Sequence, residues 1–212
     1  MHMDRRQFVK NLGLGTASLS MGSLVTASSC APSGDSSLKQ NVKEGEDGQF
    51  LFIGDDIAIA QTEYGKVQGY LLNHVYTFLG VPYGADTSGK NRFMPPQKPE
   101  PWTDVRPAVF YGNTAPQRME NRWPNNYGTF ADHWNYWDVS EDCLYLNVWT
   151  PGIADGKKRP VLVWLHGGGF TNGSGIEQDG YHGENISREG DIVFCSINHR
   201  LGPIGFSDLS GV

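Results

Sequence analysis

A run of apolar residues that ends directly in three glycines constrains the fold of this chain more than any other feature. Residues 161–165, VLVWL, form a continuous apolar run, which is typical of a strand buried on both faces of a central sheet. The residues that follow at once are His166, Gly167, Gly168, Gly169 and Phe170. Successive glycines let the backbone approach a ligand closely and direct neighbouring N–H groups into one cavity. The pattern therefore predicts a loop that binds a negatively charged oxygen.

The segments on either side of this loop predict an α/β fold. Residues 183–189 favour a short helix capped by Asn185 or Ser187, and residues 191–197 repeat the apolar strand pattern. The local order of strand, glycine loop, helix and strand is typical of α/β proteins. Further short strands are predicted at residues 57–61, 66–72, 75–80 and 144–150. We therefore expect an N-terminal antiparallel β region that leads into a central, mostly parallel sheet.

Two irregular stretches separate the predicted strands. The prolines of the first stretch are Pro82, Pro95, Pro96, Pro99 and Pro101. Proline lacks an N–H donor and excludes long helices and central strands, so this stretch is expected to wrap over a surface. Residues 116–142 hold six aromatic side chains at their centre and show no helical or strand period. Such a loop either packs down on the protein or lines a cavity, and Trp134 and Trp137 are its candidate pocket residues.

Charge and cysteine content exclude several classes of protein. The 17 basic and 23 acidic residues give a formal net charge of −6, which argues against nucleic acid as a partner. No run of residues approaches the ~18 apolar residues of a membrane-spanning helix. With three cysteines, no CxxC and no zinc-ligand spacing, the chain is expected to hold no metal site and no cofactor. Cys143 and Cys195 lie in apolar runs and are expected to be buried, reduced thiols.

The first 29 residues have the pattern of an export signal. Arg5 and Arg6 precede Phe8 and Lys10, and a weakly apolar stretch follows at residues 12–27. This arrangement resembles a twin-arginine (Tat) signal, whose cationic head stays in the cytoplasm while the apolar stretch engages the export machinery. A short amphipathic surface helix is the alternative. We expect residues 1–29 to be the Tat-like signal peptide of a bacterial protein.

Cys30 is a candidate lipidation site at the end of that signal. Residues 27–30, ASSC, resemble a bacterial lipobox without its usual leucine. Lipidation would anchor the protein to a membrane, whereas ordinary cleavage would release it, so periplasmic, membrane-anchored and secreted locations all stay open. Residues 30–49 have little apolar content and are expected to be a flexible linker to a folded domain at residues 50–212.

Two kinds of chemistry use a glycine loop at the end of a strand. Phosphate binding requires G-x-x-x-x-G-K-[ST] or G-x-G-x-x-G, and neither motif occurs in the chain. The second kind is acyl transfer, in which the HGGG-type loop of lipases and esterases donates backbone N–H groups to an oxyanion. Residues 166–169 fit this second kind, and a plain flexible turn is the alternative.

Several further motifs accompany the glycine loop. They are YGKVQG at residues 64–69, FLGVPY at 78–83, RF and PP within 92–96, SEDCLYLNVW at 140–149, HGGGF at 166–170 and NHRLGPIGF at 198–206. In this order and spacing, the chain resembles the type B carboxylesterase (cholinesterase-like) family of the α/β-hydrolase fold over residues 61–209.

The resemblance implies roles for the residues of the glycine loop. The amides of Gly168 and Gly169 are expected to donate hydrogen bonds to the tetrahedral intermediate, while His166, Gly167 and Phe170 shape the loop. Losing one such donor typically lowers the rate by about 10²–10³.

The resemblance also implies structural roles outside the loop. Arg92 and Glu141 are expected to form an ion pair that ties the proline-rich stretch to the strand after it. Arg200 is expected to be a buried structural arginine whose partner lies beyond Val212.

Three features depart from the family pattern. Ala115 stands where many members have the cysteine that pairs with the cysteine of EDCL, so Cys143 is expected to have no disulfide partner. His199 replaces a frequent tyrosine, and we expect it to pack and to form hydrogen bonds rather than act as a base. No G-x-S-x-G nucleophile elbow occurs in the 212 residues. The chain is therefore expected to be an N-terminal fragment that stops before the elbow.

These observations together predict an exported serine carboxylic-ester hydrolase that acts on a small-molecule ester, uncharged or modestly polar. The serine nucleophile and its acid and histidine partners are expected outside this chain, which should be inactive alone. One alternative is a non-catalytic, cholinesterase-like binding or adhesion protein, and another is a short protein whose half-sheet pairs with a second chain. The identity of the ester and the oligomeric state are not predicted.

Overall fold

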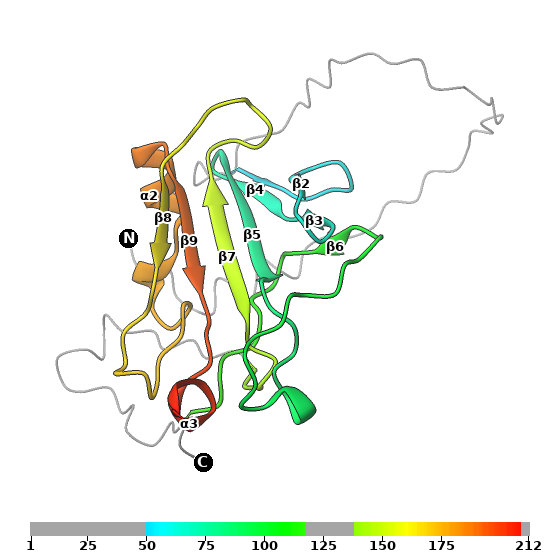
Figure 1. Ribbon diagram of the computed structural model, residues 1–212. Coiled ribbons are helices and arrows are strands. Elements are labelled where there is room, and N and C mark those ends of the chain that lie inside the picture. Colours follow the sequence, from blue (N-terminus) through cyan, green and yellow to red (C-terminus); the bar gives the residue numbers. More distant parts are fainter. Residues whose placement is uncertain (1–49, 118–137, 209–212) are drawn as a thin grey trace, which may run out of the picture. The chain divides into compact units, whose positions relative to one another are not determined.

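Two β-sheets make up most of the regular structure (Figure 1). The computed structural model describes residues 50–117 and 138–208, all within the second of the chain's two units, Lys43–Val212. The strands of the larger sheet, in spatial order, are β1 (Leu51–Phe52), β4 (Tyr70–Leu72), β5 (Val75–Pro82), β7 (Tyr145–Thr150), β9 (Val193–Ile197) and β8 (Val161–Trp164). Those of the smaller sheet are β2 (Ile59–Gln61), β3 (Lys66–Gln68) and β6 (Arg106–Pro107).

The larger sheet is antiparallel except at the edge formed by β8. Each neighbouring pair from β1 to β9 is antiparallel, whereas β8 pairs with β9 in parallel. Between these two strands the chain forms the glycine loop, a 3-10 helix (Asp179–Tyr181) and α2 (Glu184–Gly190). The expected order of strand, glycine loop, helix and strand is therefore confirmed, with an antiparallel region leading into the one parallel pair described in the larger sheet.

The described helices are short. α2 follows Gly183, and its predicted cap Ser187 is instead fully buried inside the helix, where its Oγ donates to the Trp149 carbonyl oxygen at 3.0 Å. α3 (Gly202–Phe206) follows β9, with Pro203 in its first turn. In this part of the chain no helix has the length and apolar content that crossing a membrane would require.

Trp149 is the centre of the core between α2 and the larger sheet. Its side chain is 0% exposed and packs with Val75, Leu79 and Phe194. The Trp149 and Phe194 ring centroids lie 5.8 Å apart. Because β7 and β9 each contribute one ring to this contact, the core joins the antiparallel part of the sheet to the parallel pair.

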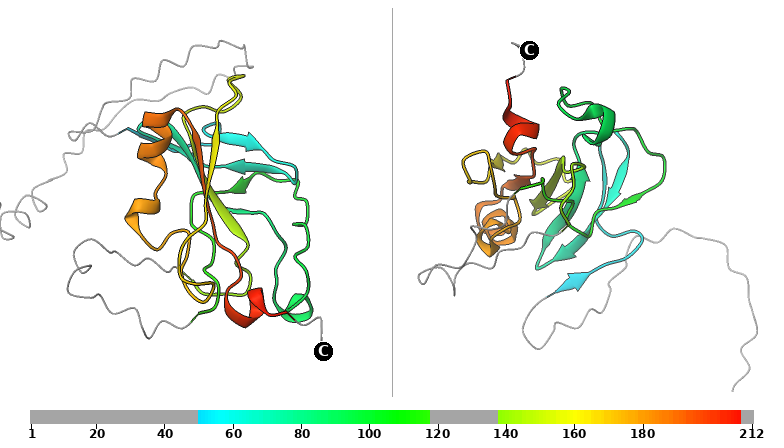
Figure 2. Two further views of the ribbon diagram at one scale, coloured as in Figure 1. Left: turned by 60° about the vertical axis from the view of Figure 1, so that its left-hand side comes forward. Right: turned by 90° about the horizontal axis from the view of Figure 1, so that it is seen from below.

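The opposite face of the larger sheet is covered by the smaller sheet. Successive side chains of a strand point to opposite faces, so Phe78 and Val148 face away from α2. They pack with Ala58 and Val67 of the smaller-sheet side. Figure 2 shows α2 and the smaller sheet on the two sides of the larger sheet.

The predicted strand at residues 66–72 is wrong as a single element, because Gly69 divides it into β3 and β4. β3 belongs to the smaller sheet and β4 to the larger one. A Cβ at Gly69 would overlap the carbonyl oxygen of Thr77, so only glycine allows the two sheets to approach here. The chain therefore changes sheets at this residue.

The apolar strand at residues 161–165 is not covered on both faces by the described residues. β8 is the outermost strand of the larger sheet, and Val161 and Leu165 are each 64% exposed. The prediction of a doubly buried strand is thus wrong for the described residues, because all four residues of β8, which point alternately to the two faces, are exposed. Unpaired backbone groups and exposed apolar side chains make this edge a pairing surface.

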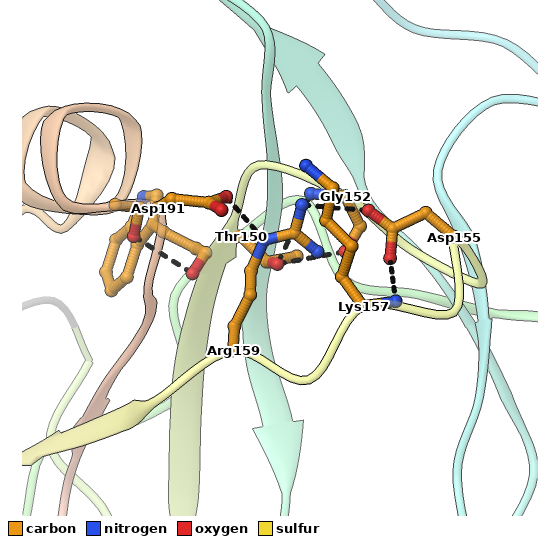
Figure 3. A network of polar contacts seen from close by, with 8 residues as sticks. Thr150, Gly152, Asp155, Lys157, Arg159 and Asp191 are labelled. Atoms are coloured by element: carbon orange, nitrogen blue, oxygen red, sulfur yellow. Dashed lines mark hydrogen bonds and ion pairs between the residues drawn. The ribbon is translucent and has the colours of Figure 1, made fainter.

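Arg159 ties the entry of β8 to the turn that follows α2 (Figure 3). Its Nη2 lies 2.8 Å from Asp155 Oδ2, and its Nε lies 2.7 Å from Asp191 Oδ1. The Arg159 side chain is largely buried between the two carboxylates. Asp191 adopts a left-handed conformation, with φ of +46°, as the C-cap of α2. By pairing with both carboxylates, Arg159 fixes the start of β8 against the start of β9.

Gly183 offers a test of the packing around Trp149. A Cβ at Gly183 would lie 2.7 Å from Trp149 Cε3 and would overlap the Phe194 ring, whereas a Cβ at Gly180 would meet nothing within 4 Å. We expect Gly183→Ala to lower the free energy of unfolding by about 1–3 kcal/mol. The matched variant Gly180→Ala should change it by less than about 0.5 kcal/mol. Urea unfolding followed by tryptophan fluorescence measures both, and equal effects would contradict the packing described.

Candidate active site in the glycine loop

The glycine loop, residues 166–170, turns sharply where β8 ends. The φ angle is +120° at Gly168, +62° at Gly169 and +65° at Phe170. The Gly168 carbonyl accepts a hydrogen bond from the N–H of Asn172 (3.3 Å), which closes the turn. A Cβ at Gly168 would overlap the Asn172 carbonyl oxygen. Both the conformation and the available space therefore require glycine at this position.

The amides of Gly168 and Gly169 are candidate oxyanion donors. Both residues are exposed, and no hydrogen bond among the described residues uses either N–H as its donor. Backbone N–H groups that lack an internal partner are available to water or to a ligand. Two neighbouring donors of this kind are what a negatively charged oxygen needs. The N–H groups of Gly168 and Gly169 are therefore available to a bound oxyanion.

His166 anchors the start of the loop. It is 9% exposed, and its Nδ1 lies 2.8 Å from the Gly167 carbonyl oxygen. Its ring stacks on that of His199, with centroids 4.5 Å apart and planes 3° from parallel. His199 Nδ1 lies 2.9 Å from the Arg200 carbonyl oxygen. His199 thus packs and forms a hydrogen bond, in line with the expectation from the sequence.

Gln117 holds the backbone that packs behind His166. The Gly173 N–H donates to Gln117 Oε1 (2.8 Å), and Gln117 Nε2 donates to the Gly173 carbonyl (2.9 Å). A Cβ at Gly173 would lie 2.9 Å from His166 Cε1, so this backbone touches the imidazole directly. The side-chain amide therefore acts as a two-point clamp behind the loop.

Sequence reasoning missed the Gln117 clamp. Gln117 lies two residues after Ala115, the position at which many family members have a cysteine. Its contact with Gly173 joins residues 56 positions apart. No local period or motif spacing indicates a contact of this kind.

Arg200, expected to be buried, is half-buried and donates from Nη1 to the Met94 carbonyl (2.8 Å).

Arg92 and Glu141 lie together as an ion pair. Arg92 Nε is 2.7 Å from Glu141 Oε1, and the carboxylate is the more buried partner. The Glu141 carbonyl also accepts a hydrogen bond from Thr87 Oγ1. The pair links the proline-rich stretch to the segment that enters β7. Nothing in these contacts gives the pair a chemical role.

Three sequence-predicted site residues lie outside the described residues. They are Trp134 and Trp137, the candidate pocket residues, and Cys30, the candidate lipidation site.

A cavity of about 320 Å³ lies beside the start of α2. Its lining includes Tyr111, Trp149 and His182. Burial lowers the pKa of His182 and raises the pKa of Tyr111 to about 12, so both side chains are uncharged at neutral pH. The His182 and Trp149 ring centroids are 5.1 Å apart, which indicates a packing role for this histidine. Across the described ranges, no three His, Cys, Asp or Glu side chains form a group that could hold a metal ion.

Cys143 and Cys195 are free and buried, as predicted. Cys143 belongs to a buried cluster with Ala115, Leu144 and Leu201. Ala115 thus fills its position by apolar contact rather than by a disulfide. Burial raises the pKa of the Cys143 thiol to about 12 and that of the Cys195 thiol to about 11.

These pKa values predict two inert thiols in the folded chain. In a Cys30→Ser variant, neither remaining cysteine should react with a disulfide reagent such as DTNB at pH 8, because both stay protonated and buried. The same variant in guanidinium chloride should react at both cysteines, which serves as the control. Rapid reaction of the native variant would contradict the buried positions.

The sheet order and the glycine loop define a partial α/β-hydrolase, and comparison with known proteins assigns its family. Residues 56–211 match the carboxylesterase family, and the chain therefore belongs to that family.

Individual relatives agree with this assignment. The chain is 45% identical over 148 residues to phenmedipham hydrolase of Pseudarthrobacter oxydans, which covers 70% of this chain and 29% of that protein. It is 39% identical over 155 residues to para-nitrobenzyl esterase of Bacillus subtilis (strain 168), and the match covers 72% of this chain and 29% of that protein. Among solved structures, the chain resembles an esterase of Clostridium hathewayi that can hydrolyse aliphatic aromatic polyesters. The TM-score is 0.68 at 38% identity, and the match covers 76% of this chain and 31% of that one. The chain thus spans less than a third of each of these relatives.

Proposed function

We propose that this chain supplies the oxyanion-hole part of an exported serine carboxylesterase. The observation that carries the proposal is the pair of exposed amides at Gly168 and Gly169, which have no hydrogen-bond acceptor among the described residues. Membership of the carboxylesterase family supports ester hydrolysis as the reaction. The substrate class is a small ester, uncharged or modestly polar.

The reaction assigns distinct tasks to this chain and to the rest of the enzyme. A serine oxygen attacks the ester carbonyl, and the electron pair of the C=O bond moves onto oxygen. The N–H groups of Gly168 and Gly169 stabilise that oxyanion. A histidine oriented by an acid takes the serine proton and returns it to the departing alcohol, and water then hydrolyses the acyl-serine.

The serine, acid and histidine belong to a part of the enzyme other than these 212 residues. No G-x-S-x-G motif occurs in the sequence, although this elbow presents the nucleophile in α/β-hydrolases. The exposed apolar strand β8 supports this division, because its outer edge is ready to pair with a further strand. The chain alone is therefore inactive.

Export and anchoring complete the proposal. The paired arginines at residues 5 and 6 and the weakly apolar stretch after them favour Tat export in a bacterium. Cys30 is the proposed lipid attachment site, which would anchor the enzyme to a membrane. The unengaged amides favour an enzyme over a non-catalytic binding protein, because binding alone has no use for an oxyanion hole.

A chimera tests the proposal directly. Residues 56–208 of this chain replace the matching segment of the Bacillus subtilis para-nitrobenzyl esterase, which supplies the rest of the enzyme. We expect the chimera to hydrolyse p-nitrophenyl acetate. Gly169→Pro removes one N–H donor, and we expect it to lower kcat by about 10²–10³.

Gly156→Pro is the matched control for the chimera. Gly156 has a φ of +73° and open space around it, much like Gly169, but lies in the loop before β8. The chimera with Gly156→Pro should keep most of its activity, because this change strains the backbone about as much as Gly169→Pro does but removes no candidate oxyanion donor. Equal losses in the two variants, or hydrolysis by the isolated 212-residue chain above its own Gly169→Pro variant, would contradict the proposal.

A further inference from the structure

Both ends of the glycine loop contact one short segment that follows β9. His166 begins the loop and stacks on His199, and Phe170 ends the loop and packs on Phe206. His199 and Phe206 also contact each other edge to face, with ring centroids 5.7 Å apart and planes at 85°. We call His199 and Phe206 the aromatic brace. The four rings therefore form one continuous row across the loop.

The contacts of the brace are specific in geometry. The two imidazole planes are nearly parallel, and the Phe170 and Phe206 centroids lie 4.7 Å apart. Aromatic pairs at such distances contribute beyond their buried area. Each imidazole is also held by its own Nδ1, which lies within hydrogen-bond distance of the next residue's carbonyl oxygen. Both rings thus have little freedom to rotate.

A backbone hydrogen bond reinforces the brace at the end of the loop. The N–H of Gly202 donates to the Phe170 carbonyl at 2.7 Å. Gly202 itself has a φ of +56°, which glycine adopts without a steric penalty. The start of α3 is therefore fixed to the last residue of the glycine loop.

The loop needs such support because its backbone is strained. Phe170 has a φ of +65°, an unfavourable conformation for a residue with a bulky side chain. Conformations of this kind persist only where the surroundings impose them. If Phe170 returned to a negative φ, the peptide between Gly169 and Phe170 would turn, and the loop that contains the two candidate donors would change shape.

We infer that His199 is a positioning residue for the oxyanion hole. By stacking on His166 and supporting Phe206 against Phe170, it holds the loop in the shape that presents the N–H groups of Gly168 and Gly169. Its ring acts by shape and contact and transfers no proton. The expected effect of His199 on catalysis rests on the proposed function. Its expected effect on the shape of the loop rests on the ring contacts alone.

Hydrogen exchange in the complete 212-residue chain tests the structural consequence. The amides of Asn172 and Gly202 donate to the carbonyls of Gly168 and Phe170, so their exchange rates report the shape of the loop. In His199→Ala we expect both amides to exchange about tenfold faster or more, because the loop opens locally. In His199→Phe, which keeps a flat ring, we expect rates near those of the unchanged chain.

Two internal controls separate a local effect from loss of the fold. The Val193 amide, which donates to the Pro160 carbonyl at 2.9 Å beside β8, should exchange equally in all variants. His74→Ala removes an exposed imidazole at the opposite end of the sheet from the glycine loop and should change neither loop amide. Phe206→Ala should accelerate the loop amides as His199→Ala does.

Kinetics in the chimera test the catalytic consequence. We expect His199→Ala to lower kcat about tenfold or more while KM changes less than about threefold, because the loop acts in the transition state. His199→Phe should restore most of kcat, which a proton-transferring imidazole would not allow.

The outcomes distinguish this inference from the proposed function. Unchanged exchange of the Asn172 and Gly202 amides in His199→Ala would overturn the inference, as would a loss of kcat that His199→Phe fails to restore. An inactive chimera with His199 in place would count against the proposed function, and the exchange rates would still decide whether the brace holds the loop.

Discussion

The parallel pairing of β8 with β9 is the interaction on which the rest of the candidate site depends. Its register sets Trp164 opposite Ser196, so the two strands end together. The segments that follow them therefore leave the sheet at the same edge. The glycine loop continues from one strand and the segment of the aromatic brace from the other. His166 therefore meets His199 as a consequence of the register. Arg159 fixes the other end of the pair through Asp191.

The glycine loop combines features that are unfavourable for an isolated segment of chain. Successive residues with positive φ and two amides without internal acceptors both cost free energy unless neighbouring structure imposes them. Here the neighbours are the Gln117 clamp on Gly173, the hydrogen bond from Gly202 and the aromatic brace. Donors that are held in place before charge develops need no reorganisation during the reaction. The free energy spent in folding to hold the loop in this strained conformation is thus consistent with a catalytic role for its two amides.

The sequence predicts the parts of this site that depend on neighbours in the chain. The glycine triplet after an apolar run indicates the loop, and residues 183–189 indicate α2 to within one residue. The exposure of β8 and the division of residues 66–72 at Gly69 depend on which strands lie alongside, and residue patterns do not specify strand neighbours. The Gln117 clamp likewise escapes prediction, because it joins distant segments through a side-chain amide that suits many environments.

The most direct test of the oxyanion-hole assignment is a crystal structure of the chimera with its serine phosphonylated by a p-nitrophenyl phosphonate. The phosphonyl oxygen occupies the position of the oxyanion in the tetrahedral intermediate. We expect this oxygen to lie about 2.7–3.1 Å from the amide nitrogens of Gly168 and Gly169. An oxygen that points away from both amides, toward solvent or toward other donors, would contradict the assignment.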